Sequence, residues 1–193
     1  MHKRVVLIGG GGHASDILAV YEAIARQTGE AHPVIGILDD GEAAPHRFVN
    51  RGVKQIGTVD DLRHIDATHY ILGLGWPRTR EAMHQRIKGC GLEVASVVHP
   101  FAVVPPGATI GEGHVVLQFV SVGVGATIGD HVYLSHGALL SHDDVIGDFV
   151  SVMPGASISG AVTVGRAATI GANATVVEGN SIGAGPPLGL APL

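Results

Sequence analysis

The sequence predicts a small N-terminal α/β domain, a Rossmann-like half with a parallel sheet, followed by a parallel β-helix. Two patterns predict this fold class. An aliphatic residue returns at every sixth position from Val104 to Ile182, and before this repeat short apolar runs alternate with helical patterns. The composition agrees, because charged residues make up only 15% and aromatic residues 4% of a chain that holds 29 glycines. We therefore expect an α/β domain over residues 1–97, a β-helix over 98–185 and a C-terminal tail over 186–193.

The six-residue repeat is unbroken over 14 positions. A helix has a period of about 3.6 and a strand a period of two, so neither alone explains a period of six. A hexapeptide repeat is typical of a parallel β-helix, in which each hexad forms a short strand and a corner. Three hexads make one triangular coil, strands of adjacent coils lie ~4.8 Å apart, and stability comes from stacking of neighbouring coils. The repeat positions are Val104, Ile110, Val116, Val122, Ile128, Leu134, Leu140, Ile146, Val152, Ile158, Val164, Ile170, Val176 and Ile182.

Glycine follows the aliphatic residue in half of the hexads, for example at Gly111, Gly129, Gly147 and Gly165. We expect these glycines to form corners at which a side chain would clash or the φ angle is positive. Ala or Val stands four positions after most aliphatic residues, and these small side chains let the wall turn without overfilling the core.

The first 97 residues alternate predicted strands and helices, as in a small parallel α/β unit. Residues 4–8 form a β-branched apolar run that predicts a buried strand, and the apolar residues of 16–24 have a helical spacing that ends near Gly29. The other expected elements are strands at 34–38, 70–74 and 93–98, a loop at 42–51, a strand end and helix start at 56–62 with Asp60 or Asp61 near the N-cap, and a helix at 78–89.

A glycine-rich turn, residues 9–12, separates the first strand from the first helix. Such a turn exposes backbone N–H groups at the positive end of the helix and suits a phosphate group. The pattern Gly9-x-Gly11-x-x-Ala14 satisfies a relaxed dinucleotide fingerprint, with Asp39 or Asp40 placed to meet a ribose hydroxyl. Because fewer than 100 residues precede the repeat, a mononucleotide or nucleotide-sugar site fits better than a complete dinucleotide fold. The alternative is that these glycines only allow close packing of helix and strand.

Charge, cysteine content and the N-terminus exclude several classes of protein. The formal net charge of -5 argues against a nucleic-acid partner, since phosphate binding needs a basic face. The single cysteine, Cys90, excludes a disulfide framework and fits a reducing compartment. The first apolar run is too short for a signal-peptide core or a membrane span, so we expect a soluble cytoplasmic protein without a membrane partner.

Four motifs resemble the sialic-acid O-acetyltransferase family of left-handed hexapeptide-repeat proteins. This family includes N-acetyltransferases that act on UDP- or GDP-linked 4-amino-sugars. The resemblance covers nearly the whole chain and implies a left-handed β-helix, acetyl-CoA as co-substrate, a nucleotide-sugar substrate, and a role in surface polysaccharide biosynthesis. It also implies a homotrimer with active sites between subunits. The motifs are Gly11-Gly12-His13, Ile37-Leu38-Asp39-Asp40, Gly73-x-Gly75 and residues 141–149 (SHDDVIGDF).

The resemblance assigns roles to individual residues of the β-helix. His142 would be the general base that takes a proton from the attacking amine or hydroxyl, and Asp143 would be its carboxylate partner. The N–H of Gly160 would face the thioester carbonyl. Ser151 and Ala172 would also lie in the acetyl-CoA site.

In the α/β domain the resemblance implies a site for the nucleotide sugar. The glycine-rich turn would lie near the diphosphate, and the two aspartates near the nucleoside. The implied substrate-binding residues are Gly11, Gly12, His13, Asp39, Asp40 and Gly75.

The chain departs from the family pattern in three places. Ser151 replaces a second histidine that commonly touches acetyl-CoA, and Asp144 replaces a small residue or cysteine at a position whose phase points inward. About one coil before the closing segment is also missing. Two alternatives therefore stay open: an O-acetyltransferase that acts on a sugar such as sialic acid, and a non-catalytic nucleotide-binding scaffold that has lost its CoA groove.

The histidines of the repeat also allow a metal hypothesis. His131 and His136 are spaced like two of the three zinc ligands of γ-class carbonic anhydrases. The position of the third ligand holds Ala95, and His99 is out of phase. We therefore expect no metal, and His136 either lines the cleft of His142 or lies at the surface.

Overall fold

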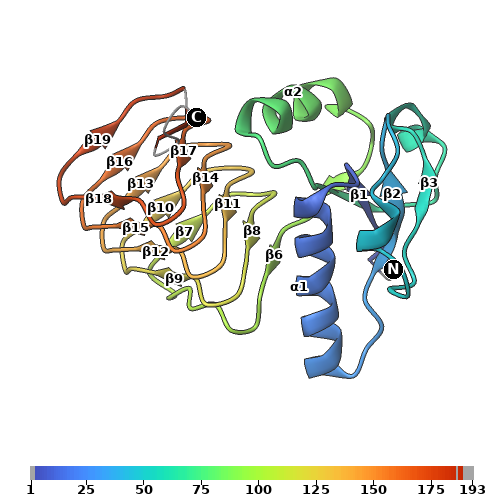
Figure 1. Ribbon diagram of the computed structural model, residues 1–193, viewed down its shortest axis with the longest axis horizontal. Helices are drawn as coiled ribbons and strands as arrows, with labels where there is room; N and C mark the ends of the chain where they lie inside the picture. Colours follow the sequence, from blue (N-terminus) through green and yellow to red (C-terminus); the bar gives the residue numbers. More distant parts are fainter. Residues whose placement is uncertain (1–2, 186, 189–193) are drawn as a thin grey trace. The chain divides into compact units, whose positions relative to one another are not determined.

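The computed structural model describes residues 3–185 and 187–188 (Figure 1). The chain divides into two compact units, Met1–Val97 and Val98–Leu193. The expected C-terminal tail, 186–193, lies outside the described residues apart from the short strand β20 (Pro187–Leu188). Among the described residues, no helix has the length and apolar character needed to cross a membrane.

The first unit, which we call the head, is a parallel five-stranded sheet in the order β3-β2-β1-β4-β5. The central strand β1 is fully buried between β2 and β4, which explains its continuous apolar sequence. The predicted strands at 4–8, 34–38 and 70–74 and both predicted helices are confirmed with small shifts of their ends. The elements are β1 (Val5–Ile8), α1 (Gly12–Thr28), β2 (Val34–Leu38), η1 (Pro45–Arg47), β3 (Gln55–Gly57), η2 (Val59–Arg63), β4 (His69–Leu72), α2 (Pro77–Ile87) and β5 (Glu93–Val94).

Three details of the head differ from the sequence prediction. The N-cap of η2 is Thr58, and Asp61 completes a capping box from the third position of the helix, because the threonine hydroxyl and the carboxylate satisfy each other's ends of the turn. The loop at 42–51 contains the 3₁₀ turn η1. The strand expected at 93–98 is two strands: β5 pairs with β4 of the head, and β6 (Val97–Val98) pairs within the second unit.

The second unit, the solenoid, is a left-handed parallel β-helix with three faces of stacked two-residue strands (Figure 1). Residues 18 positions apart pair in register, such as Ile128 with Ile146 and Ile146 with Val164, so three hexads make one coil as predicted. The five-stranded face consists of β7 (Thr109–Ile110), β10 (Thr127–Ile128), β13 (Val145–Ile146), β16 (Thr163–Val164) and β19 (Ser181–Ile182). The four-stranded face consists of β9 (Ser121–Val122), β12 (Leu139–Leu140), β15 (Ser157–Ile158) and β18 (Thr175–Val176). The six-stranded face consists of β6, β8 (Val115–Val116), β11 (Tyr133–Leu134), β14 (Ser151–Val152), β17 (Thr169–Ile170) and β20.

The aliphatic repeat forms the core of the solenoid. Its side chains stack inside the prism together with the small residues of the fifth hexad position, and Leu134, Val152 and Ile158 have no exposed surface. The glycines after the aliphatic residues serve close approach of coils and not a positive φ angle. A Cβ atom on Gly147, for example, would lie 2.8 Å from the backbone nitrogen of Arg166 in the next coil.

Candidate active site

The predicted base and its partner lie in a turn at one edge of the solenoid. His142 and Asp143 follow β12 of the four-stranded face and precede β13 of the five-stranded face, so we call this corner of the prism the His142 edge. Their side chains are exposed by 63% and 69%, and His142 Nδ1 lies 3.0 Å from Asp143 Oδ2. The structure therefore brings the two predicted residues together at the surface, within reach of a ligand.

Two glycines of neighbouring coils make room for this pair. A Cβ atom on Gly160 would lie 2.6 Å from both Cε1 and Nε2 of the His142 ring. A Cβ atom on Gly125 would collide with the Asp143 carboxylate. These glycines are 18 residues away from His142 and Asp143, on the following and the preceding coil. The imidazole and the carboxylate are thus seated on bare backbone above and below the turn.

The hydrogen bond from the imidazole to Asp143 sets the electrostatics of the pair. It raises the pKa of His142 above its ordinary value, because the carboxylate stabilises the imidazolium form. It also occupies Nδ1, so that in the neutral ring Nε2 carries the free lone pair. That atom faces Gly160, and it is therefore the nitrogen that can accept a proton from a ligand bound at this edge.

Gly160 also presents a backbone donor beside the imidazole. Its carbonyl accepts a hydrogen bond from the N–H of Gly179, but its own N–H has no acceptor within the part of the chain that the structure describes. A backbone N–H next to a general base is suited to stabilise negative charge that develops on a substrate oxygen.

Asp144 points into the core beside this turn, as its phase predicts. The residue has no exposed surface. Its two carboxylate oxygens accept hydrogen bonds from the backbone N–H groups of Ser141, at 2.8 Å, and Val162, at 2.9 Å. Burial raises the pKa of Asp144, and the two backbone hydrogen bonds act in the opposite direction. The buried carboxylate is thus paired, as its burial requires.

The positions that the resemblance assigns to acetyl-CoA are not together in one chain. Ser151 is buried on the six-stranded face, which is the face opposite the His142 edge in a triangular prism. Ala172 is exposed at the edge between the six- and four-stranded faces. His136 lies on the same edge as Ala172 and not beside His142, because a spacing of one hexad advances the chain by one face.

In the head, part of the glycine-rich turn serves packing alone. A Cβ atom on Gly9 would lie 2.7 Å from Leu74, and one on Gly10 would collide with Ala43. The remaining two glycines of the turn are open. A Cβ atom on Gly11 would meet nothing within 4 Å, and one on Gly12 would meet only the guanidinium of Arg47, at 3.5 Å. Close packing therefore explains the first two glycines, and the other two leave backbone accessible at the N-terminus of α1.

Arg47 is the residue of this site that the sequence analysis did not single out. It belongs to η1, is exposed, and lies over Gly12 at the start of α1. No ion pair or hydrogen bond of its guanidinium group is found among the described residues. Nothing in the sequence distinguished it from other arginines, since its place over the turn results from the path of the loop after β2.

His13 and Gly75 are in contact, as a shared site requires. A Cβ atom on Gly75 would lie 2.6 Å from Cε1 of the His13 ring, so glycine is needed at this position of the loop after β4. Arg80 of α2 is 2% exposed and donates hydrogen bonds to the carbonyl oxygens of Leu74 and Gly75. Burial lowers the pKa of His13, so the ring is held in its neutral form beside the turn.

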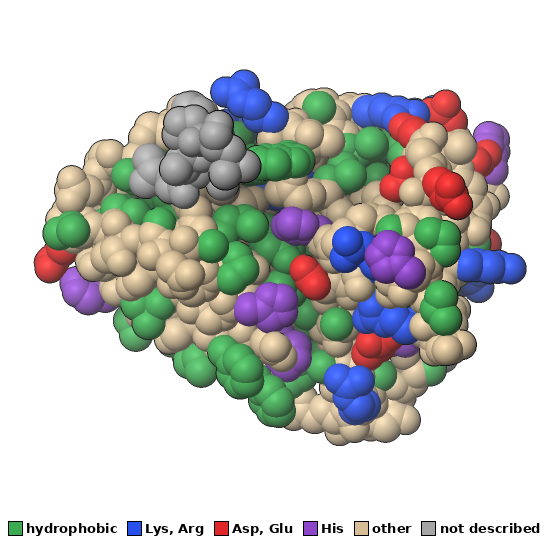
Figure 2. Space-filling view, in the orientation of Figure 1, with side chains coloured by type: hydrophobic (Ala, Val, Ile, Leu, Met, Phe, Trp, Pro, Cys, Tyr) green, Lys and Arg blue, Asp and Glu red, His purple; other side chains and the backbone are tan. Residues whose placement is uncertain are grey.

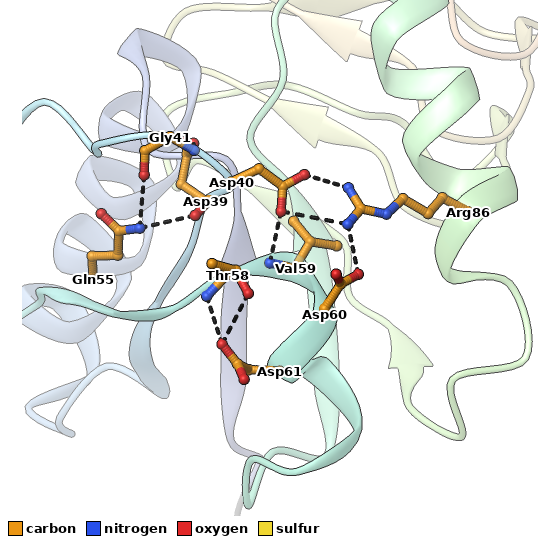
Figure 3. Close-up of polar contacts among 9 residues, drawn as sticks. All are labelled: Asp39, Asp40, Gly41, Gln55, Thr58, Val59, Asp60, Asp61 and Arg86. Carbon is orange, nitrogen blue, oxygen red and sulfur yellow. Dashed lines mark hydrogen bonds and ion pairs between the residues drawn. The ribbon is translucent and has the colours of Figure 1, made fainter.

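The two aspartates after β2 bind to the protein itself (Figure 3). Asp39 accepts hydrogen bonds from the N–H of Gly10, at 2.6 Å, and of Gly41, at 2.8 Å. Asp40 accepts one from the N–H of Val59 and pairs with Arg86, which also contacts Asp60. Both carboxylates therefore hold loops at the carboxyl edge of the sheet. Their expected contact with a nucleoside has no direct support in this geometry.

Gln55 adds a further anchor to the same loop. Its side-chain amide donates to the carbonyl oxygens of Asp39 and Gly41 and accepts a hydrogen bond from the N–H of Ala43 (Figure 3). The segment that runs from β2 to η1 is thus fixed at several points before it reaches Arg47.

The described residues contain no group of three or more His, Cys, Asp or Glu side chains arranged to hold a metal ion. His131 and His136, which suggested such a site, lie on different edges of the prism.

Comparison with known proteins gives matches over both units. The family described as the PglD N-terminal domain matches residues 4–87. No curated protein sequence matches the chain. The acetyltransferase domain of PglB from Neisseria gonorrhoeae, solved with acetyl coenzyme A, is 27% identical with a TM-score of 0.85, over 97% of this chain and 88% of that one. PerB from Caulobacter crescentus, solved with CoA and GDP-perosamine, is 30% identical with a TM-score of 0.83, over 95% and 84% of the two chains. WeeI from Acinetobacter baumannii shares the fold at 19% identity, with a TM-score of 0.65 over 97% and 95% of the two chains.

Proposed function

Because this chain belongs to the hexapeptide-repeat family of nucleotide-sugar N-acetyltransferases, we propose that it transfers the acetyl group of acetyl-CoA to the amino group of a nucleotide-linked amino sugar. As a member of this family it is an acetyl-CoA-dependent acyltransferase. The observation that carries the finer proposal is the arrangement of His142, Asp143 and Gly160 at one edge of the solenoid.

Each of these three residues has a role in the transfer. An amine becomes acidic as it attacks a thioester carbonyl, and His142 Nε2 is the free nitrogen that can accept its proton. Asp143 holds Nδ1 and stabilises the imidazolium that forms. The free N–H of Gly160 is placed to stabilise charge on the carbonyl oxygen. The bond from the amine nitrogen to the acetyl carbon forms, and the bond from that carbon to the CoA sulfur breaks.

We assign the nucleotide end of the substrate to the head. The open backbone of Gly11 and Gly12 at the start of α1 suits a diphosphate, and Arg47 would supply a positive charge on the open side. His13 and Gly75 border this turn on its other side. For Asp39 and Asp40 we propose an indirect role, because their carboxylates hold the loops around the site. The complex of PerB with GDP-perosamine supports a nucleotide sugar as the substrate class.

We also propose that the active enzyme is a homotrimer. His142, Ser151 and Ala172 lie on different faces or edges of one prism, so they can line one acetyl-CoA site only if neighbouring copies contribute some of them. Exposed hydrophobic side chains on the solenoid support such packing (Figure 2). They are Phe101, Val103, Phe119, Val124, Leu139, Val145 and Val177.

The decisive experiment measures CoA release from acetyl-CoA in the presence of UDP-, GDP- and dTDP-linked amino sugars. We expect turnover with one nucleotide and none with the matching 4-hydroxy sugar. Thermal shift with each ligand alone identifies the binding partners independently of turnover, since a bound ligand stabilises the folded state by mass action. Turnover with the hydroxyl sugar alone would contradict N-acetylation. Nucleotide binding without acetyl-CoA binding would contradict the enzyme assignment and indicate a scaffold.

A further inference from the structure

Among the described residues, Asp144 is the only acidic side chain that is buried. The residues one coil before and one coil after it, Ala126 and Val162, occupy the same inward position and belong to the hydrophobic core. A carboxylate is costly at such a position unless it is hydrogen-bonded. Packing therefore does not account for this aspartate, and its two hydrogen bonds have to be considered.

These hydrogen bonds join the two backbone segments that form the active site. Oδ2 accepts from the N–H of Ser141, at the start of the turn that carries His142 and Asp143. Oδ1 accepts from the N–H of Val162, two residues after Gly160 on the next coil. A single rigid carboxylate thus spans the turn of the base and the segment of the backbone donor.

Other corners of the solenoid are held from the outside. The N–H of Glu112 donates to Asp130, and the N–H of Asp130 donates to Asp148, each over 2.9 Å. At the His142 edge the corresponding outward positions are taken by His142 and Asp143, which must remain available to a ligand. A tether from the inside leaves both of these side chains exposed.

We propose that Asp144 is a positioning residue that fixes the His142 turn against the Gly160 segment for acetyl transfer. This inference rests on the proposed function. The ring of His142 already lies against Gly160, so small relative movements of the two segments change the position of Nε2 relative to the Gly160 N–H. A misplacement of about 1 Å can cost about 10²-fold in rate.

The test compares Asp144→Ala, Asp144→Asn and the control Val132→Ala. Alanine removes both tethers and reproduces the residue found at Ala126, whereas asparagine keeps one acceptor oxygen. Val132 is 1% exposed and points inward at another edge, so its truncation weakens the core without touching the turn. We expect kcat to fall roughly 10- to 100-fold in Asp144→Ala and less in Asp144→Asn, with both KM values within about threefold of wild type. Val132→Ala should keep the wild-type kcat at a temperature at which all variants are folded by circular dichroism. Folded Asp144→Ala with a kcat within twofold of wild type, or no lower than that of Val132→Ala, would overturn the proposal.

Amide hydrogen exchange tests the tether without using activity. In Asp144→Ala the N–H groups of Ser141 and Val162 should exchange at least tenfold faster, while those of Glu112 and Asp130 keep their wild-type rates. Unchanged exchange at Ser141 and Val162 would overturn the inference even if acetyl transfer were established. Absence of acetyl transfer by the wild type, with exchange as expected, would refute the proposed function and support the tether alone.

Discussion

Gly160 provides the sharpest test of the proposed chemistry, because the structure fixes what a single methyl group would do there. In Gly160→Ala the new Cβ atom would start 2.6 Å from Cε1 and Nε2 of His142, whereas an ordinary van der Waals contact begins near 3.4 Å. The ring must therefore move away by about 0.8 Å. Since His142 is exposed and Gly160 does not have a positive φ angle, the ring can move and the solenoid should remain folded.

A displacement of this size predicts a loss in kcat on the order of 10²-fold, the cost of misplacing a reacting group by about 1 Å. The KM for the nucleotide sugar should change little, because that ligand is assigned to the head. Steady-state kinetics with both substrates varied, together with thermal unfolding, measures both effects. Gly183→Ala is the matched control, since a Cβ atom on Gly183 meets nothing within 4 Å and its φ angle is not positive.

The same change in the His142→Ala background decides how the methyl group acts. If it acts by displacing the imidazole, Gly160→Ala should have little further effect once the ring is gone. A full additional 10²-fold loss in the double variant would show that the methyl group blocks the substrate or the oxygen site instead. A single variant with wild-type kcat would refute the reasoning altogether.

Three further predictions concern the base, its partner and the head. His142→Ala should lower kcat by roughly 10²- to 10⁴-fold with little change in binding of either substrate by calorimetry; a near wild-type kcat would remove it from the mechanism. The rate should rise with pH as His142 loses its proton, through a pKa above the ordinary histidine value because Asp143 stabilises the charged form. In Asp143→Asn this midpoint should move to lower pH and kcat should fall; an unmoved midpoint would contradict the pairing. Gly12→Val should abolish binding of the nucleotide sugar and preserve that of acetyl-CoA, whereas unchanged nucleotide binding would refute the site, and loss of both ligands would indicate unfolding.

The sequence was sufficient for most of the fold because its two periodic patterns are strong. The aliphatic residue at every sixth position predicted the stacked coils, and the strand and helix patterns of the head predicted its central elements. The strand expected at 93–98 was wrong because periodicity cannot show which sheet a strand joins: Glu93 and Val94 pair in the head, and Val97 and Val98 pair in the solenoid.

The site could be predicted in part. The spacing of 18 residues places Gly160 over His142, and the same offset would have placed Gly125 beside Asp143. The partners of Asp144 could not be predicted, since phase shows that a side chain points inward but not which N–H groups it meets. Arg47 was missed for a similar reason, because its position over Gly12 depends on the irregular loop after β2.

The register of 18 residues per coil also restricts how this protein can change in length. Removal of one hexad before the turn would preserve the aliphatic pattern and the hydrophobic core, yet it would rotate every later residue by one face of the prism. His142 would then emerge from a different edge relative to the coils that precede it. Insertions and deletions upstream of the turn are therefore neutral for the site only in whole coils, so viable variants of this chain should differ there by multiples of one coil.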